Sequence, residues 1–164
     1  MTITHQGKGQ FTIRSKDATI KLGPEFTIGE RTLPGAGEYD INGVEIEGLE
    51  GGIFLVRTED VFLLYLDRLD RSLTDNELEA VELADVLFVP VGGKDTDVPD
   101  QTVLNPEAAV KAINLIDPRI VIPMYYTSLE PFRKAEGKPL EMVKELKITK
   151  ATLPQEDRLV YVLE

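Results

Sequence analysis

The sequence contains no cysteine and only one histidine, His5. Without cysteine the chain cannot form disulfides, thiolate zinc sites, iron–sulfur clusters or a thiol nucleophile. With one imidazole it cannot build a site that needs two or more histidines from one chain. No apolar run approaches the roughly 18 residues of a membrane-spanning helix, and no signal peptide opens the sequence. We therefore expect a soluble cytoplasmic protein without a membrane partner.

Basic residues are also scarce, because 18 Lys and Arg stand against 29 Asp and Glu, for a net charge of −11. This balance argues against a nucleic-acid partner, whose phosphates require Lys and Arg. The 164 residues, of which 42% are hydrophobic, are enough for one domain with its own core. We predict a single domain over residues 1–164.

The first two-fifths of the sequence predict antiparallel strands. Residues 11–14 and 18–22 alternate between apolar and polar side chains around a polar turn. Asn42-Gly43 predicts a type I′ hairpin, which places Asp40 opposite Glu45, a like-charge pair that is tolerable only where it is exposed. Residues 53–56 and 61–66 are nearly continuous apolar runs, which is typical of central strands covered on both faces.

From residue 72 the pattern changes to alternating strands and helices. Thr74 and Glu77 form a capping box, which predicts a helix of about three turns reaching residue 84. Residues 85–91 and 119–124 read as buried strands, and Asn105-Pro106 begins a helix between them, so these strands should be parallel. A last helix over residues 139–147 and a strand over 158–163 complete an α/β class with a mixed sheet.

These segments resemble the metallo-β-lactamase superfamily, in particular its small branch of zinc-dependent-hydrolase-like proteins. The second half is similar through LTDNELEAVELADVLFVPVGG, LNPEAAVKAINLIDPRIVIPMYY and the terminal LKITKATLP. The first half is similar through ITHQGKGQFTI, ATIKLGPEF and PGAGEYDINGVEIEG. The resemblance implies a truncated αββα fold, an α+β sandwich with mixed sheets and outer helices, and a site at one edge between the sheets.

The departures from this family concern its metal ligands. The family's HxHxDH run is missing, because Pro24 leads within ten residues to Leu33-Pro34-Gly35 without any histidine. By alignment Arg68 stands on the position of the metal-bridging aspartate and Tyr125 on that of the last ligand histidine, while His5 matches no ligand. A hydrolytic zinc site needs about three protein ligands and an open position. The resemblance therefore implies a degenerate member with no zinc site and no cofactor.

Two interpretations of these substituted positions stay open. Arg68, Tyr125, Tyr126 and Lys8 are candidates for binding a small anionic ligand through charge and hydrogen bonds. Lys8 stands where this branch commonly has a histidine. The alternative is that Tyr125 packs into the space that a metal would occupy, as aromatic side chains usually pack in cores.

Acidic residues give further candidates, each with a plainer alternative. Asp67 and Asp70 could serve as general acid and base, or form a loop salt-bridge set with Arg68 and Arg71. Asp95, Asp97 and Asp100 could bind Ca²⁺ or Mg²⁺, or form a solvated loop that binds no metal. Hard cations prefer such oxygen ligands.

The sequence thus favours a non-enzymatic binding, regulatory or oligomerising module over an enzyme. The absence of the HxHxDH segment would uncover part of a sheet edge, so we expect a homodimer or another protein partner. The alternative is a metal-dependent hydrolase of the same fold with a rebuilt site in which Asp67, Asp70, Asp95 and Asp97 surround a hard cation.

Overall fold

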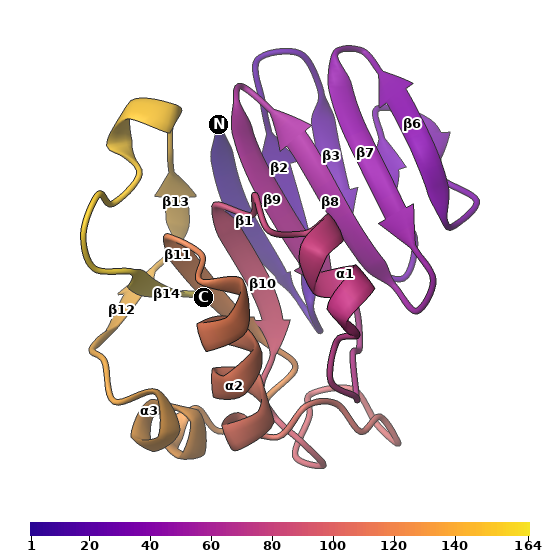
Figure 1. The fold of residues 1–164 in the computed structure, drawn as a ribbon. Coiled ribbons are helices and arrows are strands. Elements are labelled where there is room, and N and C mark those ends of the chain that lie inside the picture. Colours follow the sequence, from indigo (N-terminus) through magenta and orange to yellow (C-terminus); the bar gives the residue numbers. More distant parts are fainter.

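Two β-sheets stack face to face in the computed structural model, which describes residues 1–164 (Figure 1). The smaller sheet has the strand order β13-β1-β2-β3-β4-β5, with bounds β1 (Thr2–Gly7), β2 (Gln10–Arg14), β3 (Thr19–Leu22), β4 (Thr27–Ile28), β5 (Arg31–Thr32) and β13 (Glu145–Lys147). The larger sheet has the order β12-β14-β11-β10-β9-β8-β7-β6, with bounds β6 (Gly37–Ile41), β7 (Val44–Leu49), β8 (Ile53–Thr58), β9 (Val61–Leu66), β10 (Val86–Pro90), β11 (Ile120–Met124), β12 (Leu140–Val143) and β14 (Leu159–Leu163).

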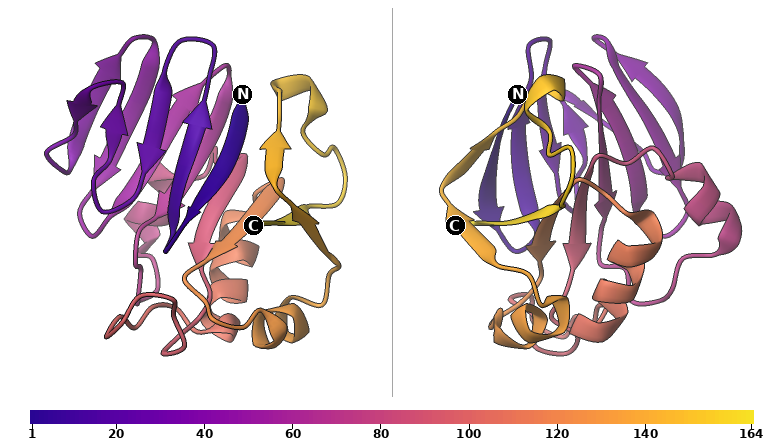
Figure 2. Two further views of the ribbon diagram at one scale, coloured as in Figure 1. Left: turned by 180° about the vertical axis from the view of Figure 1, so that it is seen from behind. Right: turned by 60° about the vertical axis from the view of Figure 1, so that its left-hand side comes forward.

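The helices cover only the outer face of the larger sheet. They are α1 (Asp75–Ala80), α2 (Pro106–Ile116) and α3 (Glu130–Glu136), and a short 3-10 turn, η1 (Lys150–Thr152), lies near the C-terminus. The view from behind shows the strands of the smaller sheet with no α-helix in front of them (Figure 2). The mixed α+β sandwich predicted from the sequence is confirmed. None of the helices is long and apolar enough to cross a bilayer.

The hydrophobic residues form two cores, one on each face of the larger sheet. The inter-sheet core contains 26 buried residues and the helix-side core contains 18. The sequence of strand β9 is almost continuously apolar because its two faces lie in different cores. Leu63 and Tyr65 enter the inter-sheet core, whereas Leu64 and Leu66 enter the helix-side core. Alternate residues of one strand therefore stabilise two different layers.

The predicted hairpins and the parallel unit are confirmed. Asn42 and Gly43 have φ values of 52° and 79°, as a type I′ turn requires, and Asp40 pairs with Glu45 across it. Strand β10 runs parallel to both β9 and β11. Helix α2 begins at its Asn105 cap and buries the stripe Ala109, Ala112, Ile113 and Ile116. The carboxyl ends of β9, β10 and β11 therefore meet at one edge of the sheet.

Helix α1 is shorter than predicted, because it ends at Ala80 although its capping box is present. Asp85 fixes where the next strand begins. Its carboxylate accepts a hydrogen bond from the Phe62 backbone N–H at 2.9 Å, and its own N–H donates to the Phe62 carbonyl at 2.9 Å. These bonds fix the start of β10 beside β9, so the chain must leave the helix and turn before residue 85.

The capping box makes a pH dependence testable. A hydrogen bond from Arg71, and then one from the Thr74 backbone, lowers the pKa of Glu77 from 4.5 to about 2. Because the folded pKa is depressed, this contribution to stability is complete above pH 4.5 and is lost as the pH falls towards 2. We expect Glu77→Gln to show a smaller loss of melting temperature between pH 5 and pH 2.5 than the parent protein, by about a degree or more. Glu79→Gln, on the exposed side of the same helix, is the matched control and should follow the parent.

The prediction of a last helix over residues 139–147 is wrong. Residues 140–143 form β12, which pairs parallel with β14, and residues 145–147 form β13, which pairs antiparallel with β1. Backbone partners that are distant in the sequence decide the conformation here, and local spacing does not reveal them. The helix instead lies upstream as α3, with Pro131 in its first turn, Phe132 buried and Gly137 ending it at φ 71°.

The segment that replaces the HxHxDH run forms the two short strands β4 and β5. Phe26 and Ile28 are buried in the inter-sheet core, and the edge strand β5 consists of the exposed residues Arg31 and Thr32. The edge at this position is therefore short and polar. An apolar patch that would need a partner does not lie here.

Candidate functional site

The candidate site lies where β9 and β11 end, beside the turn between β1 and β2. Asp67 directly follows β9, Tyr125 directly follows β11, and Gly9 belongs to the turn. The Tyr125 hydroxyl donates a hydrogen bond to Asp67 Oδ1 at 2.6 Å. The Tyr65 hydroxyl lies 3.2 Å from the same oxygen and 2.9 Å from the Gly9 carbonyl oxygen, so it is shared between two acceptors. Tyr65, Asp67 and Tyr125 are called the Tyr–Asp cluster below.

The Tyr125 ring fills the end of the inter-sheet space. Its side chain is buried, with 1% of the residue exposed. The ring lies so close to Gly9 that a Cβ atom at that position would be 2.6 Å from both Cε1 and Cε2. Real Cβ atoms do not approach a ring this closely, so only glycine fits. The sequence expectation that Tyr125 packs into this space agrees with this geometry.

Three residues around the site have left-handed backbone conformations. Lys8, Arg68 and Tyr125 have φ values of 53°, 53° and 55°. Such a conformation costs roughly 1–2 kcal/mol for each non-glycine residue. It lets the chain reverse sharply just after a strand. Five other non-glycine residues in turns share this conformation, so it reflects the tight reversals of the chain and does not by itself identify a site.

The tyrosines of the cluster are protonated hydrogen-bond donors at neutral pH. Burial, and then the hydrogen bond to Asp67, raises the pKa of Tyr125 to about 12. Burial is also the largest cause of a raised pKa at Tyr65, followed by the charge of Asp67. Both phenols therefore stay protonated, and each donates a hydrogen bond to the same carboxylate oxygen, Asp67 Oδ1. This arrangement satisfies Asp67 without a metal ion.

Arg68 lies beside the cluster. Its Nε atom is 3.8 Å from Asp67 Oδ1, is buried and has no hydrogen-bond partner, while 37% of the side chain is exposed. The Tyr125 hydroxyl, and to a smaller extent the charge of Asp67, raises the pKa of Arg68. A permanent positive charge thus faces both the cluster and solvent. Asp70 is exposed and makes no ion pair.

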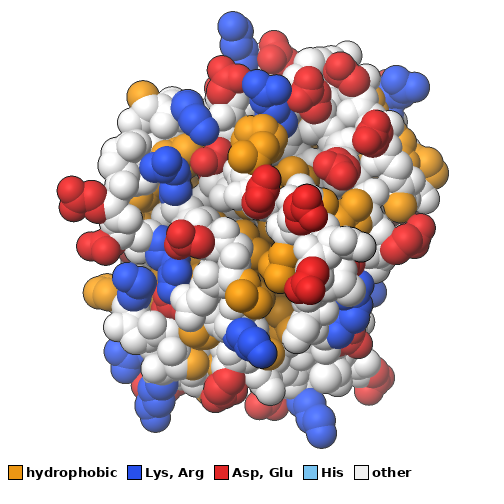
Figure 3. Space-filling model, viewed as in Figure 1, with side chains coloured by type: hydrophobic (Ala, Val, Ile, Leu, Met, Phe, Trp, Pro, Cys, Tyr) orange, Lys and Arg blue, Asp and Glu red, His pale blue; other side chains and the backbone are white.

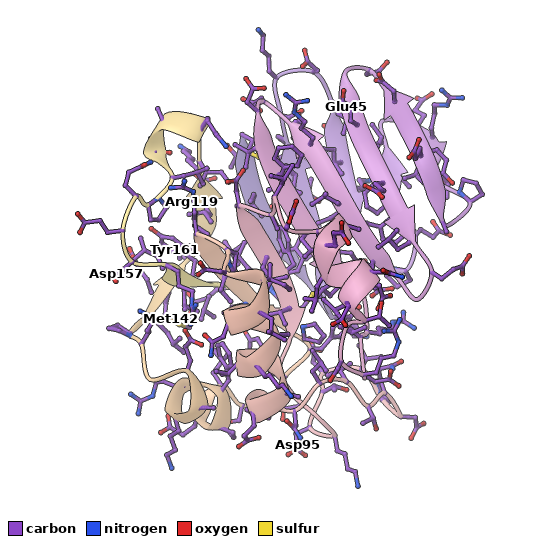
Figure 4. The ribbon with its side chains drawn as sticks, in the orientation of Figure 1. Glu45, Asp95, Arg119, Met142, Asp157 and Tyr161 are labelled. Atoms are coloured by element: carbon purple, nitrogen blue, oxygen red, sulfur yellow. The ribbon has the colours of Figure 1, made fainter.

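The other predicted residues lie on the loops around this point. The Lys8 backbone N–H donates to Asp97 Oδ2 at 3.0 Å, and the Lys8 side chain is exposed. Tyr126 packs against the helix-side core while Tyr125 packs in the inter-sheet core, so the two adjacent tyrosines enter different layers. Asp95, labelled in Figure 4 on the loop after β10, is exposed, as is Asp100.

The single histidine has a structural role. The His5 ring stacks on Phe11 with 4.8 Å between the ring centroids, and its Nδ1 lies 3.0 Å from the Leu163 carbonyl oxygen. Burial lowers the pKa of His5. The ring is therefore neutral at pH 7 with the proton on Nδ1, where it joins β1 to β14.

A family model described as a β-lactamase superfamily domain matches residues 2–125. The chain belongs to this superfamily. A proposed Zn-dependent hydrolase of the metallo-β-lactamase superfamily from Thermotoga maritima shares its fold, with a TM-score of 0.82 and 23% identity over 99% of this chain and 98% of that chain. Igni18, a metallo hydrolase from Ignicoccus hospitalis, has a TM-score of 0.58 and 12% identity over 83% of this chain and 90% of that chain. The metallo-β-lactamase fold protein YhfI from Bacillus subtilis has a TM-score of 0.51 and 13% identity over 78% of this chain and 50% of that chain.

The residues at the superfamily's metal position do not fit a zinc ion. No three His, Cys, Asp or Glu side chains come together anywhere in the chain in a way that could hold a metal. A zinc centre needs at least three such ligands. At this point the cluster offers one carboxylate, two protonated phenols and a neighbouring guanidinium.

Two important residues of the site were not found from the sequence. Tyr65 lies inside an apolar run that indicated only a central strand, and Gly9 belongs to a turn. A signal for Tyr65 was available, because a buried tyrosine needs a partner for its hydroxyl. No local signal identified Gly9, since its requirement comes from a ring 116 residues later in the sequence.

Proposed function

We propose that this member of the β-lactamase superfamily acts by binding another macromolecule and performs no metal-dependent hydrolysis. One observation supports the part of the proposal that concerns metal-dependent hydrolysis. The Tyr125 ring lies against Gly9 and its hydroxyl donates to Asp67 at 2.6 Å, so protein side chains fill this end of the inter-sheet space and satisfy one another. Both phenols are protonated and a guanidinium lies beside them, so a dication would meet few lone pairs and one repelling charge.

The alternative of a rebuilt carboxylate site requires Asp67, Asp70, Asp95 and Asp97 to surround one cation. Asp67 already accepts two phenol hydrogen bonds, Asp97 accepts a backbone N–H, and Asp70 and Asp95 are exposed. The geometry gives this alternative no support beyond the number of acids. The binding module is therefore the better-supported proposal.

Thermal melting with added cations tests the proposal. Zn²⁺, Mn²⁺, Mg²⁺ and Ca²⁺ at millimolar concentration should each leave the melting temperature unchanged, because an ion that binds only the native state would raise it. The matched variant carries Asp95→Asn, Asp97→Asn and Asp100→Asn. A rise of several degrees in the parent that this variant abolishes would support the cation site on the acidic loop and contradict the proposal.

The same assay tests an anionic ligand at Arg68. Inorganic phosphate is the probe. A phosphate-dependent rise in melting temperature that Arg68→Gln removes would make the exposed part of this guanidinium a binding group. The same rise in both proteins would exclude Arg68 from the role.

A further inference from the structure

The outer face of the larger sheet is covered by helices at one end and bare at the other. Helices α1 and α2 lie over β9, β10 and β11, whereas β6 and β7 have no helix in front of them (Figure 1). The bare part contains a hollow of about 450 Å³. Its apolar floor is formed by Leu55 and Phe62, which both pack in the helix-side core. The hollow therefore begins where the helix layer ends.

Four carboxylates surround this floor and lie opposite one another across the strands. Glu38 pairs with Glu47, and Asp40 pairs with Glu45. These four residues are called the acidic face. Figure 3 shows acidic side chains gathered over β6, β7 and β8, and Glu45 is labelled in Figure 4. Like charges directly opposite each other in a sheet are destabilising, so this arrangement has a cost that packing does not explain.

One basic residue lies among these acids, and it is already engaged. Arg57 is 3.2 Å from Glu45 and 3.2 Å from Asp60, and its guanidinium lies over the Phe62 ring at 5.5 Å. Glu38, Asp40 and Glu47 make no ion pair. Three of the four carboxylates thus stand without a counter-charge around an apolar floor.

We propose that the acidic face docks a basic amphipathic helix of a partner protein. The apolar floor continues the helix-side core, so a helix placed there would extend the layer formed by α1 and α2. Equivalent carboxylates on one strand, such as Glu45 and Glu47, are two residues or about 6.8 Å apart. Basic side chains at positions i and i+4 of a helix are separated by about 6 Å along its axis. A helix parallel to the strands can therefore present Lys or Arg to both carboxylate rows and an aliphatic side chain to the partly exposed Phe62, beneath which Leu55 is buried.

A second copy of this chain is a poorer occupant. The net charge of −11 on each copy makes self-association at an acidic face repulsive. A cationic partner relieves the like-charge pairs on binding. This inference rests on the proposed binding function, and it names the chemistry of the partner.

Binding of a labelled synthetic peptide tests the inference. The probe is a helical peptide with lysines at i and i+4 and leucines between them, and the same peptide with glutamates in place of lysines is the control. The test variant carries Asp40→Asn, Glu45→Gln and Glu47→Gln. The matched variant carries Glu82→Gln, Glu141→Gln and Glu156→Gln, which change the net charge equally at exposed positions elsewhere.

We expect the lysine peptide to bind the parent protein, with an affinity that falls steeply as salt is added. The test variant should bind at least tenfold more weakly and the matched variant within twofold of the parent. Arg57→Gln should tighten binding, because it removes the competing cation. The test variant should melt at or above the parent temperature, since it loses the like-charge pairs.

Three results would overturn the inference: no binding of the lysine peptide to the parent, equal weakening in both triple variants, or a dimer in light scattering that only the test variant dissociates. The last result would assign the face to a second copy. The proposed function has its own test, the thermal melts with added cations. Peptide affinity and cation binding are independent measurements, so failure of the inference can be told apart from failure of the proposed function.

Discussion

Replacing Gly9 by alanine should destabilise the protein by about 3 kcal/mol, the sum of a left-handed backbone penalty and the overpacking of a filled space. Gly9 has φ 70°, and a Cβ atom there would lie 2.6 Å from two carbons of the Tyr125 ring. For a chain of this length the loss corresponds to a decrease in melting temperature of roughly 10 °C. Thermal melting and urea denaturation both measure it.

Gly7→Ala is the matched control, because Gly7 has φ 87° but a Cβ atom there would have nothing within 4 Å. It should cost only the backbone penalty of about 1–2 kcal/mol. Two further variants distinguish the contribution of the Tyr125 ring from that of its hydroxyl. In Tyr125→Ala the cost of Gly9→Ala should fall to that of Gly7→Ala, whereas in Tyr125→Phe it should stay near its full value. If Gly9→Ala costs no more than Gly7→Ala in the parent, the ring does not lie against Gly9.

Replacing Arg158 by methionine should cost about 3–5 kcal/mol, because it leaves a buried charge without a partner. The Glu136 side chain is 0% exposed, and the Arg158 side chain, which is 14% exposed, lies 3.1 Å from it. Arg158 also donates to Asn114 Oδ1 at 2.8 Å. The guanidinium of Arg158, the residue just before β14, therefore links α2 to α3. Urea denaturation at pH 7 measures the loss.

The double variant Glu136→Gln and Arg158→Met removes both charges and should recover part of the stability lost in Arg158→Met. The control is Arg133→Met, whose ion pair with Glu130 lies within α3 and is more than half exposed on both sides. It should change stability very little. An equally small effect of Arg158→Met would mean that water reaches Glu136 and that α3 is not fixed by this pair.

The sequence predicts some elements of the fold correctly and misplaces others. Elements specified by neighbouring residues were predicted well, such as the Asn42-Gly43 hairpin, the Asn105 cap and the buried stripe of α2. The region after Tyr126 was predicted poorly, because β12 and β13 exist only through pairing with β14 and β1. Pro131 and Gly137 mark the boundaries of the helix that is present, whereas the prediction placed it at residues 139–147.

The candidate site was accessible from the sequence only in part. The resemblance located Asp67, Arg68 and Tyr125 at the ends of strands, and the structure places them together. The alignment put Arg68 on the metal-bridging position, whereas the group that reaches Tyr125 is the neighbouring Asp67. A one-residue difference of this kind depends on the left-handed turn at Arg68, which no local pattern of side chains specifies.

The acidic face was visible in the sequence as a single like-charge pair. Its full extent depends on the register of three strands, which sets Glu38 opposite Glu47 and Glu47 opposite Leu55. The register of the sheet thus extends the pair Asp40 and Glu45 to a surface of four carboxylates, for which we propose a partner.

The zinc content of the folded protein decides whether the Tyr–Asp cluster takes the place of a metal. It is measured by elemental mass spectrometry after equilibrium dialysis against a zinc buffer. Because Tyr125, Tyr65 and Asp67 satisfy one another, we predict far less than one zinc ion for each chain, with no increase in Tyr125→Phe. One or two tightly held zinc ions for each chain, displaced by Asp67→Asn, would show instead that the cluster is a metal site.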